Sequence, residues 1–166
     1  MEIYLVRHAI AEDRDPDRWP DDSVRPLTEE GERRFRKAAR GLAARFAAPD
    51  VVLASPFARA WRTAELLHEE AGWPDPEPCP ELEAGRSPKD GVQALARTAT
   101  RSVVATVGHE PNLSELASLL LAGHDQAVSI RMKKGGAAVL QLDGRPRPAS
   151  ATLLWLLTPA VLRALD

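Results

Sequence analysis

Short apolar runs alternate along the chain with longer segments in which apolar residues recur at helical spacing. Three runs, residues 2–6, 51–54 and 102–107, are rich in β-branched residues and bounded by turn signals, which is typical of buried strands. Two further runs, residues 137–142 and 151–157, are joined by a segment with Gly and Pro and predict a hairpin. The pattern therefore predicts five clear strands.

The intervening segments predict helices. Thr28, followed by Glu29 and Glu30, is a favourable N-cap for a helix that continues to about residue 46. Ser55 is expected to cap the next helix, with Pro56 at its first position. The remaining expected elements are helices over residues 57–70, 88–98 and 113–121, a short strand near residues 78–82, and a last helical turn or two from residue 159.

This order of elements predicts one domain over residues 1–166. Strands that alternate with helices favour an α/β fold, and the final hairpin makes the sheet mixed. We expect a single-domain, three-layer α/β/α arrangement with a mixed, mostly parallel central sheet. No internal repeat or interdomain linker is visible in the sequence.

Composition narrows the class of protein. A net charge of -2 gives no reason to expect nucleic acid or an anionic membrane as a partner, and no apolar run approaches the length of a membrane span. The strand-like run begins at residue 2, so no signal peptide is expected. A single cysteine, Cys79, excludes an internal disulfide and fits a reducing compartment. The sequence therefore predicts a cytoplasmic protein.

Charged and imidazole side chains follow three of the predicted strands. Arg7 and His8 end the first strand, Arg59 follows the second, and His109 follows the third. Because the carboxyl ends of parallel strands meet at one edge of a sheet, we expect two imidazoles and two guanidiniums in one crevice. Arg25, ahead of the first long helix, could join them. Guanidinium groups match phosphate oxygens, so the simplest content of this crevice is a phosphate group.

Two histidines in a phosphate pocket can divide the chemistry between them. A neutral imidazole nitrogen can attack phosphorus and hold the phosphoryl group covalently, and the other imidazole can donate a hydrogen bond to that group. The alternative is a metal site formed by His8, His109 and Glu110. Clustered arginines disfavour this alternative because they repel a divalent cation.

Four segments together resemble the histidine phosphatase superfamily, whose fold is phosphoglycerate mutase-like, and in particular its SixA-type phosphohistidine phosphatases. These segments are Leu5-Val6-Arg7-His8-Ala9, Ser23-Val24-Arg25-Pro26-Leu27-Thr28, Ser55-Pro56-Phe57-Ala58-Arg59-Ala60 with Thr63, and Gly108-His109-Glu110-Pro111. The resemblance covers nearly the whole chain, and the motifs stand in the family's order. It implies a phosphohistidine intermediate and no metal or organic cofactor.

The resemblance also assigns roles by position. It implies His8 as the nucleophile, His109 as the second histidine of the phosphate pocket, and Arg7, Arg25 and Arg59 as phosphate-binding residues. Ala9 stands where the family usually has glycine, a departure that the SixA-type branch tolerates.

A proton donor for the leaving group is less clear in the sequence. Larger family members use a carboxylic acid from the middle connection, where this chain has Glu81 and Glu83; Glu12 and Asp13 are further candidates. Each is more simply explained as a solvated loop carboxylate. An imidazole leaving group can carry its own proton, so a missing acid favours phosphohistidine over an alkyl phosphate. The short chain also lacks long cap insertions, which favours an exposed phosphohistidine on a protein, such as a phosphorelay component.

Two other functions stay open on the sequence alone. One is a broad small-molecule phosphomonoesterase, and the other is a non-catalytic module that binds phosphorylated proteins. The presence of both His8 and His109 argues against the second, because arginines alone could bind phosphate. Lys133 and Lys134 are either a solvated lead into the hairpin or a basic rim that attracts a phosphorylated partner. The sequence does not determine the oligomeric state.

Overall fold

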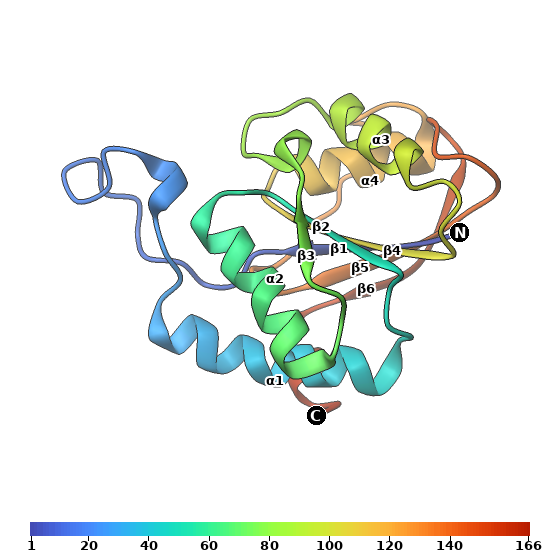
Figure 1. The fold of residues 1–166 in the computed structure, drawn as a ribbon. Helices are drawn as coiled ribbons and strands as arrows, with labels where there is room; N and C mark the ends of the chain where they lie inside the picture. The colour runs from blue at the N-terminus through green and yellow to red at the C-terminus, as the bar shows by residue number, and fades with distance from the viewer.

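A six-stranded mixed sheet forms the centre of the molecule (Figure 1). The computed structural model describes residues 1–166, and the order of strands across the sheet is β3-β2-β4-β1-β5-β6. The strands are β1 (Glu2–Arg7), β2 (Val51–Ala54), β3 (Pro76–Pro78), β4 (Val103–Gly108), β5 (Ala137–Leu142) and β6 (Ala151–Leu157). The first four pair in parallel, whereas β5 and β6 are antiparallel. The predicted α/β fold with a mostly parallel sheet is confirmed.

Helices cover both faces of the sheet. They are α1 (Glu29–Arg45), α2 (Ala58–Ala71), α3 (Pro88–Arg97), α4 (Asn112–Ala122) and α5 (Pro159–Arg163), with short 3-10 turns η1 (Asp22–Val24) and η2 (Pro80–Leu82). Figure 1 shows α3 and α4 on one side of the sheet and α1 and α2 on the other. The short α5 packs on α1 so closely that a Cβ at Gly41 would overlap the Leu162 carbonyl. None of the helices combines the length and the apolar character that crossing a membrane requires.

The alternation of side chains along β1 supplies both halves of the core. Tyr4 and Val6 belong to the apolar cluster under α1 and α2, and Ile3 and Leu5 belong to the cluster under α3 and α4. All four are fully buried or nearly so. Burial on both faces explains why this strand is a continuous apolar run in the sequence.

The parallel strands bring the predicted polar residues to one edge. In the registers of β4 with its two neighbours, Arg7 lies opposite Gly108 and Ala54 lies opposite Val107. His8, Ser55 and His109 each directly follow these positions. The three segments therefore leave the sheet side by side, as expected for a ligand crevice in an α/β fold.

Two local predictions were wrong. The short strand expected near residues 78–82 lies earlier, over Pro76–Pro78, and residues 80–82 form η2. Proline lacks the amide proton that a sheet ladder needs, which limits the pairing of β3 with β2. This pairing ends at the hydrogen bond that the Cys79 N–H donates to the Ala54 carbonyl. Ser55 does not cap α2, which begins at Ala58 after Phe57 with no side-chain cap. The Ser55 hydroxyl lies beside His109 instead.

The hairpin strands have the predicted bounds, but β6 is far more exposed than its apolar sequence suggests. It is the outer strand of the sheet, and Leu154, Trp155 and Leu156 are 42–46% exposed. The Arg45 guanidinium lies 5.7 Å from the centroid of the Trp155 ring and covers part of it. Because β6 is the outer strand, it has a neighbouring strand on one side only. This position explains why its side chains are exposed although they are apolar.

Candidate active site

His8 is a buried, neutral imidazole with a defined tautomer. Its Nδ1 lies 2.7 Å from the Ala9 carbonyl oxygen, and a carbonyl only accepts hydrogen bonds. Nδ1 therefore carries the proton, and the lone pair of Nε2 is free. Burial, together with the charges of Arg59 and Arg7, lowers the pKa of His8 to about 3, although the bond to Ala9 acts in the opposite direction. At pH 7 the ring is thus neutral, with a lone pair on Nε2.

His109 lies next to His8 across the crevice. The two ring centroids are 5.1 Å apart, and the Nε2 of His109 lies 2.9 Å from the Ser55 hydroxyl oxygen. Burial, together with the interaction with His8, lowers the pKa of His109 to about 2. Nδ1 is buried and bonds to no protein atom. If the Ser55 hydroxyl donates to Nε2, then Nδ1 carries a proton that it can donate to an anion.

Arg59 and Arg25 meet at a single carboxylate, that of Asp22. Arg59 is 3% exposed, and its Nη2 donates to the Asp22 Oδ2 at 2.9 Å. The Nε of Arg25 donates to the other carboxylate oxygen at 2.8 Å. The structure therefore brings together both of these predicted phosphate-binding arginines.

Asp22 is the residue that the sequence analysis missed. Burial raises its pKa, but hydrogen bonds and charges from Arg25 and Arg59 outweigh burial and hold the pKa below its usual value. The ionised carboxylate thus compensates two guanidiniums held close together. The only sequence signal was an acidic residue three positions before Arg25, in a segment rich in acids.

Arg7 is fixed from the opposite side by the turn that precedes β5. Its Nη1 donates to the Met132 carbonyl at 2.8 Å, and its Nε is buried without a protein partner. The N–H of Gly135 donates to the carbonyls of Arg7 and His8, at 3.1 and 3.0 Å. Gly135 has a φ of 75°, which glycine adopts without strain. This turn holds the Arg7-His8 backbone in place.

Thr63 connects the end of β1 to α2. Its hydroxyl accepts from the Ala9 N–H at 3.0 Å and donates to the Arg59 carbonyl at 2.7 Å. The residue is fully buried. The two bonds fix the positions of His8 and Arg59 relative to each other.

The carboxylates considered as proton donors do not bond to the histidine pair. Glu81 binds Arg97 at 2.8 Å, and its own backbone N–H and Arg97 hold its pKa below the usual value despite partial burial. Glu83 pairs with Arg86 at 3.5 Å. In the first loop, the Glu12 carboxylate pairs with Arg18, and Asp13 is exposed.

Glu110 differs from these carboxylates. Burial raises the pKa of Glu110. The hydrogen bond from Ser114 and the charge of Arg7 lower this pKa, but burial outweighs them. One carboxyl oxygen accepts from the Ser114 hydroxyl, and the other is buried without a partner. The sequence analysis considered Glu110 only as a metal ligand. No group of three or more His, Cys, Asp or Glu side chains is placed to hold a metal ion, so the donor set does not support that alternative.

The two buried histidines are expected to make the protein sensitive to acid. Above pH 6.5 they are neutral in both the folded and the unfolded chain. Below pH 6.5, these histidines bind protons in the unfolded chain but not in the folded chain. The free energy of unfolding therefore falls as the pH decreases toward the folded-state pKa values of about 3 and 2. The free energy of unfolding should drop by about 2 kcal/mol per histidine between pH 7 and pH 5.

Urea unfolding at the two pH values measures this loss. His8→Asn should remove about half of it, and replacement of the exposed His124 should not change it. Equal stability of the wild type at pH 7 and pH 5 would contradict the expectation.

Known proteins resemble this chain in sequence and in fold. Residues 3–84 match the family model described as Histidine phosphatase superfamily (branch 1). An uncharacterised protein of Picosynechococcus sp. is 33% identical over an alignment of 143 residues, which covers 82% of this chain and 82% of that protein. Among solved structures, the protein histidine phosphatase SixA complexed with tungstate has a TM-score of 0.83 at 26% identity, over 96% of this chain and 98% of that one. A putative phosphohistidine phosphatase SixA from Agrobacterium tumefaciens has a TM-score of 0.78 at 25% identity, over 95% and 97%.

Proposed function

Because the chain belongs to the histidine phosphatase superfamily and is similar throughout to SixA-type members, we propose that it removes the phosphoryl group from phosphohistidine on a protein. The observation that carries this proposal is the state of His8. Its ring is neutral, Nδ1 is occupied by the Ala9 carbonyl, and Nε2 is left as the nucleophile.

The proposed reaction has two displacements. The lone pair of His8 Nε2 attacks phosphorus, the bond between phosphorus and the substrate imidazole breaks, and the electron pair of that bond returns to the leaving nitrogen. Water then attacks phosphorus on His8, which releases inorganic phosphate and a proton and restores the neutral ring. Arg7, Arg25, Arg59 and His109 stabilise the charge on the phosphoryl oxygens. Because guanidiniums supply this positive charge, we propose that no metal ion takes part.

The nature of the leaving group supports phosphohistidine over an alkyl phosphate. An imidazole leaves as a neutral ring when its second nitrogen carries a proton, whereas an alkoxide needs a proton from an acid. Asp22 and Glu81 both have lowered pKa values and are poor acids at pH 7. These two carboxylates are thus better suited to pairing with arginine than to donating a proton.

One observation favours phosphomonoester hydrolysis as the second candidate. Glu110 follows His109, has a raised pKa and interacts with the charge of Arg7, so it is the carboxyl group best suited to donate a proton. If this is its role, Glu110→Gln should reduce hydrolysis of an alkyl phosphate and leave hydrolysis of phosphohistidine nearly unchanged.

The test compares two peptides of one sequence, one with phosphohistidine and one with phosphoserine at the same position, in excess EDTA. We expect kcat/KM to be at least about 10²-fold higher for phosphohistidine, the usual contribution of a positioned proton donor. Equal rates would support the monoesterase, and loss of activity in EDTA would contradict metal independence. If neither peptide reacts but inorganic phosphate binds, the chain is a phosphate-binding module.

A further inference from the structure

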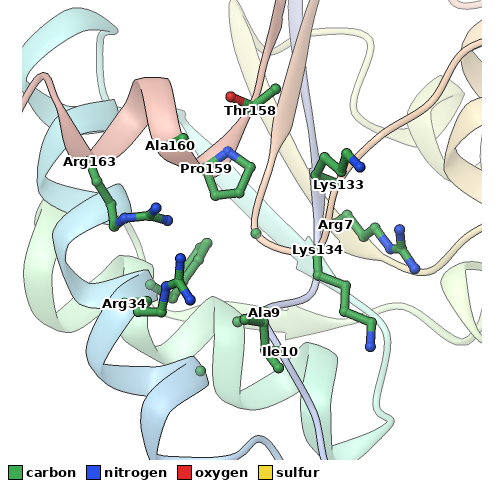
Figure 2. A pocket seen from close by; sticks show the side chains of 13 residues that line it. Arg7, Ala9, Ile10, Arg34, Lys133, Lys134, Thr158, Pro159, Ala160 and Arg163 are labelled. Atoms are coloured by element: carbon green, nitrogen blue, oxygen red, sulfur yellow. The ribbon is translucent and has the colours of Figure 1, made fainter.

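A basic cleft lies next to Arg7 and Ala9, the residues on either side of His8, and between α1, α5 and the turn before β5. Its volume is about 560 Å³, and five of its thirteen lining residues are cations: Arg7, Arg34, Lys133, Lys134 and Arg163. No Asp or Glu lines it. Figure 2 shows Arg34 and Arg163 on one side of the cavity, with Lys133 and Lys134 across from them. The cleft is strongly cationic in a chain whose net charge is -2.

Few of these charges are compensated within the protein. On the same helix α1, Arg36 and Arg40 bind Glu70 at 2.6 and 2.7 Å. By contrast, the carboxylate near Arg34, that of Glu30, is 3.9 Å away. Lys133, Lys134 and Arg163 form no ion pair within 4.0 Å, in contrast to the paired cations of α1 and α2. These side chains are therefore available to an anionic ligand.

Part of the lining of the cleft, which we call its floor, is apolar. Ile10, Phe35, Pro159 and Ala160 line the cleft together with the cations. Its volume lies within the range of pockets that hold small ligands or short peptide segments. A ligand that matches both the cations and the apolar lining carries several negative charges and an apolar group.

The turn that carries Lys133 and Lys134 is attached to the backbone of His8. The Gly135 N–H donates to the carbonyls of Arg7 and His8, and Arg7 and Ala9, the residues on either side of His8, both line the cleft. The charge of Lys134 also contributes to the low pKa of His8. A ligand whose phosphoryl group lies at His8 is thus close enough to continue into the cleft.

We propose that the basic cleft binds an acidic segment that flanks the phosphohistidine of a protein substrate. This inference rests on the proposed function and adds to it the substrate class. The cations come from four separate segments, β1, α1, α5 and the turn before β5, so a small anion would contact fewer of them than an extended ligand would. A segment with several carboxylates and an apolar side chain can contact both sides and the floor.

The experiment uses two phosphohistidine peptides, one with glutamates on both sides of the histidine and one with glutamines in their place. At low salt, kcat/KM of the wild type should be about tenfold higher for the glutamate peptide, and 0.5 M NaCl should remove most of this preference. The double variant Arg34→Gln with Arg163→Gln should lose the preference and keep the rate for the glutamine peptide. The charge-conserving pair Arg34→Lys with Arg163→Lys should retain the preference.

A charge-matched control replaces Lys89 and Arg101 with Gln, since neither lines the cleft, and it should behave as the wild type. Equal rates for the two peptides, or a preference that survives Arg34→Gln with Arg163→Gln, would overturn the inference. Direct binding of the unphosphorylated, fluorescently labelled glutamate peptide tests the cleft independently of catalysis. If neither peptide is hydrolysed, the proposed function fails, but weaker peptide binding by the Gln double variant still supports the cleft, and unchanged binding contradicts it.

Discussion

His8→Ala is expected to lower kcat/KM for a phosphohistidine peptide by at least about 10³-fold. The reason is that no other side chain at the site offers a free lone pair that could attack phosphorus in its place. His109, the nearest imidazole, shares its Nε2 with the Ser55 hydroxyl. Binding of inorganic phosphate should fall much less, since the variant leaves Arg7, Arg25 and Arg59 in place. The expected loss is therefore mainly in kcat.

A second measurement identifies the nucleophile directly. The wild type, stopped at alkaline pH during turnover, should carry a phosphoryl group on His8 that mass spectrometry detects after digestion, and His8→Ala should carry none. His124→Ala is the matched control, because its imidazole is exposed and lies outside the site. Activity of His8→Ala within tenfold of the wild type, or a phosphoryl group on another residue, would contradict the proposed role.

The positions of the site residues at strand ends were predictable, because strand pairing in the sheet determines where those ends lie. Arg7, His8 and His109 end or follow apolar runs that are easily recognised, and parallel pairing of β1, β2 and β4 brings those ends together. The roles of the same residues came from the family resemblance and stay proposals. The pattern of the chain thus located the crevice and suggested a phosphate group in it, and the resemblance assigned roles to the individual residues.

Loop residues were not predictable in the same way. Asp22 lies in a segment without periodicity, and its contact with Arg59 spans 37 positions of the chain. The contact between Arg7 and the Met132 carbonyl spans 125 positions and involves a backbone atom that any residue would supply. Such contacts depend on the path of a loop over a finished fold, which local propensity does not determine.

The basic cleft illustrates the same difference. Lys133 and Lys134 are adjacent in the sequence, so a basic rim could be considered from the sequence alone. Arg34 is one of several arginines on α1, and only the folded structure distinguishes it from its neighbours by placing it across the cleft from the lysines. The sequence suggested half of the cleft, and the tertiary structure supplied the rest.

Arg59→Gln is expected to lower kcat/KM by about 10³-fold, and Arg59→Lys by about 10²-fold. The guanidinium is almost fully buried. Its Nη1 and Nη2 donate to the carbonyl and the carboxylate of Asp22, and its Nε–H is buried without a protein partner. A lysine ammonium cannot reproduce this planar set of donors. Steady-state kinetics with a phosphohistidine peptide measures both losses. Arg62→Gln, on the same helix but paired at the surface with Glu32 and Glu69, should keep its activity.

The loss of activity must be separated from a loss of stability, because Arg59 also binds Asp22. Arg59→Gln leaves the Asp22 carboxylate short of a partner, so the free energy of unfolding should fall by about 2 kcal/mol and the pKa of Asp22 should rise. Adding Asp22→Asn removes that charge and should recover most of the stability without recovering activity. If the double variant regains activity together with stability, Arg59 serves only to hold the loop, and its proposed role in binding the phosphoryl group is wrong.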